Sequence, residues 1–222
     1  MSRFAHTLVA LIAAGAAAGA AAQPITLTAT LSNAQEGPTV IPTTVGGAPR
    51  PASFGNATFQ INAAHTSMSF SATVFNIDFT GSQTADTNDN LANAHIHAGP
   101  TGAPGTTAPV VWGFIGTPFN DNNPNDVVVT PFATGVGGTV SGKWDAPEGN
   151  NTTFAAQLGN ILAGLSYINF HTAQFPSGEV RGQILAVTAV PEPETTALLA
   201  VGLGMLAAWT RRRARGQAAS RS

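Results

Sequence analysis

Strict alternation of small polar and apolar residues over positions 67–74, within the segment 67–77, is the feature that most restricts the fold of this chain. Serine or threonine takes the positions between four apolar residues, which are Met68, Phe70, Ala72 and Val74. Successive side chains of a strand point to opposite faces of a sheet, so this period of two predicts a half-buried β-strand. Residues 54–61 alternate in the same way just before it, and the two segments together predict a hairpin.

Further short segments with strand character follow one another between loops rich in Gly, Pro and Asn. These segments are 25–31, 92–97, 110–114, 126–132, 138–144, 166–172 and 179–187. Residues 154–162 have helical spacing instead, and Gly164 is expected to end that helix. The pattern predicts an all-β domain over residues 24–187, a single antiparallel β-sandwich of Greek-key-like type with one short helix.

The charge distribution excludes nucleic acid as a partner. Between Gln23 and Val190 the chain has three basic residues against nine acidic ones, a net charge of −6. A nucleic-acid-binding surface needs clustered Lys and Arg, which this stretch lacks. The absence of cysteine excludes disulfides, thiolate metal sites and a cysteine nucleophile. Phosphate-loop and serine-hydrolase motifs are also missing, so we assign no catalytic residue and no organic cofactor.

The N-terminal segment 1–22 has the three parts of a secretory signal peptide. Arg3 supplies the positive start, residues 8–18 are apolar, and the alanines at 20–22 fit an A-x-A cleavage site. We therefore expect export of the chain and cleavage by signal peptidase after Ala22.

The C-terminal segment 190–215 combines a short motif, an apolar stretch and a basic cluster. The residues of the motif and the cluster are Pro191, Glu192, Pro193, Arg211, Arg212, Arg213 and Arg215. Between them, residues 195–210 carry no charge and would span about 24 Å as a helix, against roughly 30 Å for a hydrocarbon core. The basic cluster favours the cytoplasmic side. The sequence predicts a transmembrane helix that holds the domain outside the membrane.

This tail resembles the PEP-CTERM sorting signal of Gram-negative bacteria in all three parts. The resemblance implies recognition by an exosortase and removal of the tail near the Pro-Glu-Pro motif. It further implies passage from an inner-membrane intermediate to the cell surface or extracellular matrix. Such proteins are common in bacteria that make exopolysaccharide and biofilm, so exopolysaccharide and other matrix components are candidate partners.

Three segments of the central region resemble the CHRD domain. They read LTATLSNAQEG at 27–37, AHIHAG at 94–99, and LAGLSYINFHT followed by PSGEVRGQI at 162–184. The resemblance covers residues 25–186 and implies a domain of the extracellular compartment. It implies little about chemistry, because no general activity is established for CHRD domains.

Three histidines of the exported region are the candidate chemistry. His95 and His97 are two residues apart on one predicted strand and share a face, while His171 lies on another strand. If these strands are near neighbours, the three imidazoles form a candidate zinc or copper site. Glu179 and Asp89 are candidate carboxylates for orienting a ring.

A structural interpretation of the same residues stays open. The histidines can form hydrogen bonds within the sheet, and Glu179 and Arg181 can lock the last strands together. In the metal interpretation, Arg181 would instead favour an anionic ligand. His65 falls in a predicted turn and is expected to be exposed. Two hypotheses remain: a non-catalytic surface or matrix binding module, and a metal-binding protein or metal-dependent enzyme that uses the three histidines.

Overall fold

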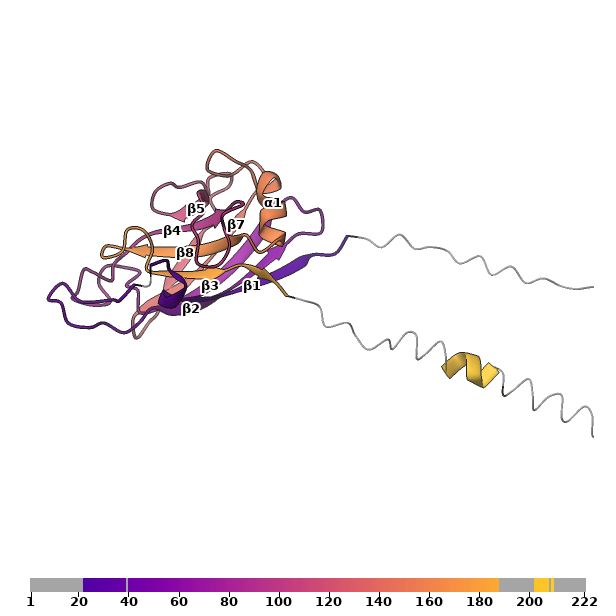
Figure 1. The fold of residues 1–222 in the computed structure, drawn as a ribbon, viewed down its shortest axis with the longest axis horizontal. Helices are drawn as coiled ribbons and strands as arrows, with labels where there is room; N and C mark the ends of the chain where they lie inside the picture. Colours follow the sequence, from indigo (N-terminus) through magenta and orange to yellow (C-terminus); the bar gives the residue numbers. More distant parts are fainter. Residues whose placement is uncertain (1–21, 39, 188–201, 208, 210–222) are drawn as a thin grey trace, which may run out of the picture. The chain divides into compact units, whose positions relative to one another are not determined.

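The computed structural model describes residues 22–38, 40–187, 202–207 and 209, which fall into two units (Figure 1). The first unit ends at Ala186 and holds the β domain. In the second unit, residues 202–207 and 209 are helical. The helices found in the described residues are all too short or too polar to span a bilayer. The predicted signal peptide, the sorting motif with its arginines, and most of the predicted membrane helix lie outside the described residues.

Within residues 22–187 the described chain forms ten strands, one α-helix and one short 3-10 helix. The strands are β1 (Ile25–Ser32), β2 (Phe54–Ile61), β3 (Met68–Phe75), β4 (Leu91–Ala98), β5 (Val110–Ile115), β6 (Val128–Pro131), β7 (Gly137–Trp144), β8 (Ser166–Thr172), β9 (Val180–Gln183) and β10 (Leu185–Ala186). The helices are η1 (Asn33–Gln35) and α1 (Phe154–Leu162). The predicted helix therefore has the observed bounds of α1.

The strands form one antiparallel sheet in the order β5-β4-β8-β9-β1-β2-β3-β7-β6, with β10 also paired to β1. The sheet curls so that its two arms face each other (Figure 1). Phe70 on β3 accordingly meets Trp112 and Phe114 on β5, with ring centroids 5.7 and 4.7 Å apart. The expected all-β antiparallel domain is confirmed, and its two layers belong to one continuous sheet.

The alternation in residues 67–77 decides which side chains of β3 enter the core. Met68, Phe70, Ala72 and Val74 are buried, whereas the residues between them are exposed or half-buried. β2 alternates in the same way and pairs with β3 along its whole length, from Phe54 opposite Phe75 to Ile61 opposite Met68. Burial of one large apolar side chain contributes about 1.5–3 kcal/mol, so the pattern alone strongly favours this register.

Strands β8 and β9 differ from the others because every one of their residues is buried. One face packs on the core through Ile168, Phe170 and Val180. The opposite face is polar, and its residues are Tyr167, Asn169, His171, Arg181 and Gln183. Loops cover this face, since the side chains of Arg181 and Gln183 donate to carbonyl oxygens of residues 102–106. Polar strand residues normally face water, so a polar face buried under loops indicates a site.

Local signals also explain the ends of α1. The Oγ1 of Thr153 accepts a hydrogen bond from the backbone N–H of Ala156 and caps the first turn. Gly164 follows the helix with φ +70°, a conformation that glycine adopts without strain. The predicted role of Gly164 as the helix terminator is confirmed.

Candidate metal centre

The pairing of β4 with β8 brings the three predicted histidines together. His95 and His97 lie on β4, and their partners on β8 are Asn169 and Tyr167. His171 is two residues further along β8, opposite Asn93. One nitrogen of each ring can be chosen so that the three atoms all lie within 4.8 Å of one another. The structure thus places all three side chains at one point on the buried polar face.

In each of the three rings, one nitrogen forms a hydrogen bond with a backbone carbonyl oxygen of a loop that covers this face. The contacts are His95 Nε2 to Thr117 O at 3.1 Å, His97 Nδ1 to Ala108 O at 2.9 Å, and His171 Nδ1 to Pro176 O at 2.9 Å. A carbonyl oxygen only accepts, so these ring nitrogens carry the protons. The other nitrogen of each neutral ring then has a free lone pair, which is what a metal ion binds.

Among the described residues, no N–H or O–H group donates a hydrogen bond to the second nitrogen of these three rings. Nε2 of His97 is buried and has no hydrogen-bond partner among the described residues. Nδ1 of His95 and Nε2 of His171 face each other at 3.1 Å. Two nitrogens bound to one zinc ion at 2.0–2.1 Å in tetrahedral geometry lie about 3.3 Å apart. The spacing of these two atoms therefore fits a shared metal ion.

Burial keeps the three rings in their neutral form. It lowers the pKa of His95 to about 4, with a further lowering from the neighbouring His171 and His97 rings. Burial also lowers the pKa of His97 to about 4, and the nearby charge of Arg181 acts in the same direction. The pKa of His171 is lowered by burial as well. Neutral imidazole is the form that binds metal, so near neutral pH protons do not compete for these nitrogens.

A stack of three side chains holds the plane of His97. Its ring lies parallel to that of Tyr167, with centroids 4.6 Å apart, and the Arg181 guanidinium carbon is 3.7 Å from the Tyr167 centroid. Strands β4 and β9 flank β8, so His97 and Arg181 approach Tyr167 from opposite sides. Arg181 thus stands beside the histidine cluster, separated from it by one ring.

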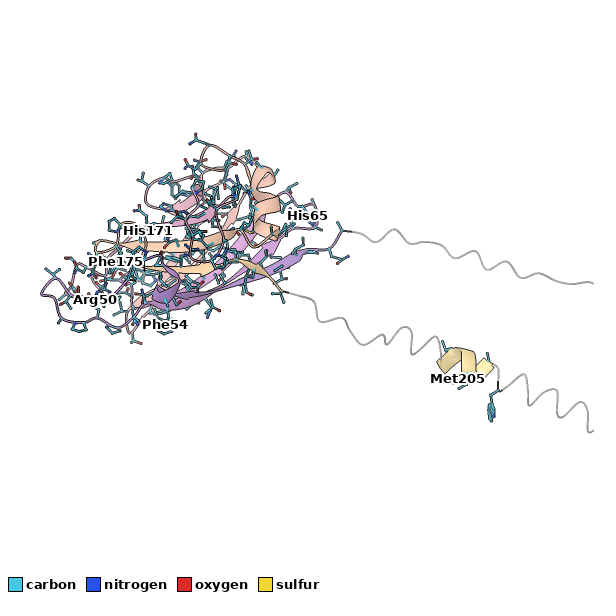
Figure 2. All side chains as sticks on the ribbon, in the orientation of Figure 1. Arg50, Phe54, His65, His171, Phe175 and Met205 are labelled. Atoms are coloured by element: carbon cyan, nitrogen blue, oxygen red, sulfur yellow. The ribbon has the colours of Figure 1, made fainter. Side chains whose placement is uncertain are left out.

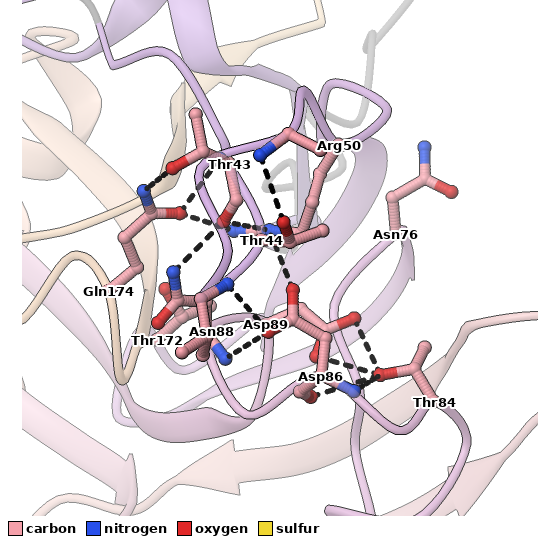
Figure 3. Close-up of polar contacts among 12 residues, drawn as sticks. Thr43, Thr44, Arg50, Asn76, Thr84, Asp86, Asn88, Asp89, Thr172 and Gln174 are labelled. Carbon is pink, nitrogen blue, oxygen red and sulfur yellow. Dashed lines mark hydrogen bonds and ion pairs between the residues drawn. The ribbon is translucent and has the colours of Figure 1, made fainter.

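The two carboxylates proposed as ring-orienting groups lie in a different network, and Figure 3 shows the part of it around Arg50 and Asp89. Glu179 accepts hydrogen bonds from Arg50 Nη2 at 2.9 Å and from Thr172 Oγ1 at 2.6 Å. Asp89 accepts from Thr84 Oγ1 at 3.0 Å. Within the described part of the chain, backbone carbonyls of loops, and not these two carboxylates, orient the three rings.

Neither Arg50 nor the orienting carbonyls belong to a sequence motif. Arg50 is one of three basic residues in an acidic domain, and this scarcity was the available signal that it pairs with a carboxylate. His65 lies in the turn between β2 and β3, as predicted, but it is half-buried rather than exposed. It sits at the opposite end of the domain from His171 (Figure 2).

Comparisons with known proteins match two regions of the chain. A family model described as the CHRD domain matches residues 27–184, which include all three histidines. A second model, described as the PEP-CTERM protein-sorting motif, matches residues 189–214. The search of curated proteins and the search of solved structures give no match.

Proposed function

Because this chain belongs to the CHRD domain family and ends in a PEP-CTERM sorting motif, we propose that it is a surface or matrix protein that binds without catalysis. Its ligand at His95, His97 and His171 is a transition-metal ion. The sorting motif supports export and processing by an exosortase, with a cell-surface or extracellular location.

The sequence supports the other steps by which we propose that the protein is exported and processed. Signal peptidase removes residues 1–22, and residues 195–210 hold the chain in the inner membrane of a Gram-negative cell until the exosortase acts. The released domain then stays with the cell surface or the exopolysaccharide matrix. The length of the apolar stretch and the arginine cluster behind it support this order of events.

One observation carries the metal site, namely that one nitrogen from each of three buried imidazoles can be chosen so that all three lie within 4.8 Å of one another. Imidazole ligands suit zinc and copper, and three protein ligands leave one position of a tetrahedral ion open. The described residues place no Asp or Glu in this cluster, so the cluster itself offers no carboxylate as a general base beside such an ion.

Metal analysis of the full chain tests the proposal. The protein is freed of metal with a chelator, dialysed against Zn²⁺ or Cu²⁺, and analysed by mass spectrometry for bound metal. We expect about one ion per chain in the wild type and a loss of that ion in His97→Gln and His95→Gln. His65→Ala is the matched control, because His65 lies outside the cluster, and it should keep the ion. Metal retained by both cluster variants, or absent from the wild type, overturns the site.

A further inference from the structure

A cavity lies on the buried polar face, next to Arg181 and Tyr167. It has a volume of about 290 Å³, and its lining comes from β8, β9, residues 36–38 and 40–41, Thr107 and the loop at 175–178. Binding pockets commonly measure about 300–1,000 Å³, so this one suits a single small molecule. None of the three clustered histidines lines it, so the cavity is a separate site.

Three side-chain atoms of its lining have no hydrogen-bond partner among the described residues. They are Oε1 of Glu36, Oδ1 of Asn169 and Nε of Arg181. Asn169 and Arg181 are each only 2 % exposed. A buried polar atom without a partner costs free energy, and three such atoms around one cavity indicate a missing ligand.

The positions of these atoms are held by their surroundings. Arg181 donates from Nη1 to Thr106 O at 2.8 Å, and its guanidinium packs on Tyr167, which fixes the direction of Nε–H. At Gly178, a β-carbon would come within 2.7 Å of Asn169 Oδ1 and 2.8 Å of Glu36 Oε1. The two side chains therefore lie close together against Gly178, where no residue with a β-carbon would fit.

The arrangement defines the chemistry of its ligand. Two oxygen acceptors and one N–H donor require a ligand with at least two donors and one acceptor close together. Neighbouring hydroxyl groups on a ring meet this need, because each hydroxyl both donates and accepts. Pro38, Val40, Ile41 and Phe175 supply an apolar wall for the C–H face of such a ring.

We infer that this cavity binds one neutral sugar unit, whose hydroxyls bond Glu36, Asn169 and Arg181. Burial raises the pKa of Glu36 to about 7 against the opposing charge of Arg181, which agrees with an enclosed carboxyl group. The inference deepens the proposed binding role and rests on it for the cellular setting, where polysaccharide is the candidate partner. It does not depend on the metal ion.

Saturation-transfer NMR on the full chain tests this site, with D-glucose and D-galactose as probes. Acetamide serves as a third probe, because an amide also carries two donors and one acceptor. We expect a signal from at least one hexose, and a Kd about tenfold or more higher in Glu36→Ala, since a hydrogen bond to the buried carboxyl group is lost. Asp145→Ala is the matched control, because that carboxylate pairs with Lys143 at 3.1 Å and does not line the cavity.

A second variant covers the case in which Glu36→Ala fails to fold. Ile41 is 76 % exposed, so Ile41→Ala should fold, and it should weaken hexose binding severalfold by removing part of the apolar wall. The inference is overturned if neither hexose binds the wild type, if only acetamide binds, or if the folded variants bind like the wild type. Hexose binding that persists in His97→Gln, together with loss of its metal, separates this site from the metal centre.

Discussion

Nδ1 of His95 and Nε2 of His171 lie 3.1 Å apart, although a loop carbonyl already holds the other nitrogen of each ring. Two neutral rings in this arrangement point lone pairs at each other, which is unfavourable unless a proton or a metal cation lies between them. Burial disfavours the extra proton, because it lowers the pKa of both histidines. A metal ion is therefore the occupant that this contact favours.

Metal should raise the thermal stability of the full chain. A ligand that binds only the folded state adds about 2.7 kcal/mol when its free concentration is a hundred times Kd. Calorimetry of the chelator-treated protein with and without Zn²⁺ should show a higher Tm in the wild type and in His65→Ala. His97→Gln should show no shift with metal. If neither Zn²⁺ nor Cu²⁺ changed the Tm of the wild type, the three histidines would have a structural role and would not bind metal.

Removal of Arg50 should strongly destabilise the domain. Glu179 is fully buried, and Arg50 is its ion-pair partner at 2.9 Å. Arg50→Met leaves the carboxylate buried without its counter-charge, which costs about 3–5 kcal/mol of unfolding free energy. Urea denaturation measures this difference. Lys143→Met is the control, because Lys143 forms partly exposed ion pairs, which contribute little to stability. Equal effects of the two substitutions would contradict the prediction.

Glu36 should make stability depend on pH. Its pKa rises from 4.5 to about 7 on folding, so between these values the folded chain keeps a proton that the unfolded chain has lost. The stabilisation is complete below pH 4.5 and is lost as pH rises towards 7.

Relative to Glu36→Gln, the wild type should therefore lose on the order of 1–3 kcal/mol of unfolding free energy across this range. Urea denaturation at about pH 5 and about pH 8 compares the two proteins on both sides of the range. A wild type that gains stability relative to the variant as pH rises would show that Glu36 is not held in a desolvated site.

Processing should remove both ends of the chain. We expect cleavage after Ala22 and loss of the segment beyond Pro193, because the tail carries a sorting motif over residues 189–214. Intact-mass measurement of protein from the cell surface tests both cuts. A Pro191→Ala, Pro193→Ala double variant should keep its tail and stay with the membrane fraction. An arginine-rich tail on wild-type protein from the extracellular fraction would defeat the sorting prediction.

Residues 24–187 should fold without either end. The apolar core of the described residues lies wholly between Ile25 and Ile184, and the first compact unit ends at Ala186. Circular dichroism of this fragment should show mainly strand, with cooperative thermal unfolding. A helix-dominated spectrum, or a fragment that stays unfolded, would show that the ends contribute to the fold.

Local periodicity was enough to predict most elements of the fold. Residues 54–61, 154–162 and 166–172 have the bounds expected for them, because their burial depends on spacing within the segment. Residues 179–187 form two strands and not the single one expected. The segment changes partner at Ile184, since β9 pairs mainly with β8 and β10 pairs with β1. Such a change depends on the sheet and leaves no local pattern.

The histidine cluster was predictable only in part, because it too depends on which strands pair in the sheet. Alternation puts His95 and His97 on one face, but the neighbour relation of β4 and β8 comes from strand order, which one sequence does not reveal. The orienting carbonyls of Thr117, Ala108 and Pro176 belong to loops. Any residue type can supply a carbonyl, so no sequence signal marks them. At the cavity, pairing of β8 with β9 sets Asn169 opposite Arg181, and only Glu36 is brought there by a loop.

The pairing of β10 with β1 has a mechanical consequence. β10 joins β1 through two residue pairs, Leu27 with Ala186 and Thr28 with Leu185. A pull on the chain after Ala186 would load these pairs first, and the next strand towards the N-terminus is β9, which carries Arg181. Tension from a C-terminal tether would therefore reach the wall of the proposed sugar cavity ahead of the strands that hold the histidines.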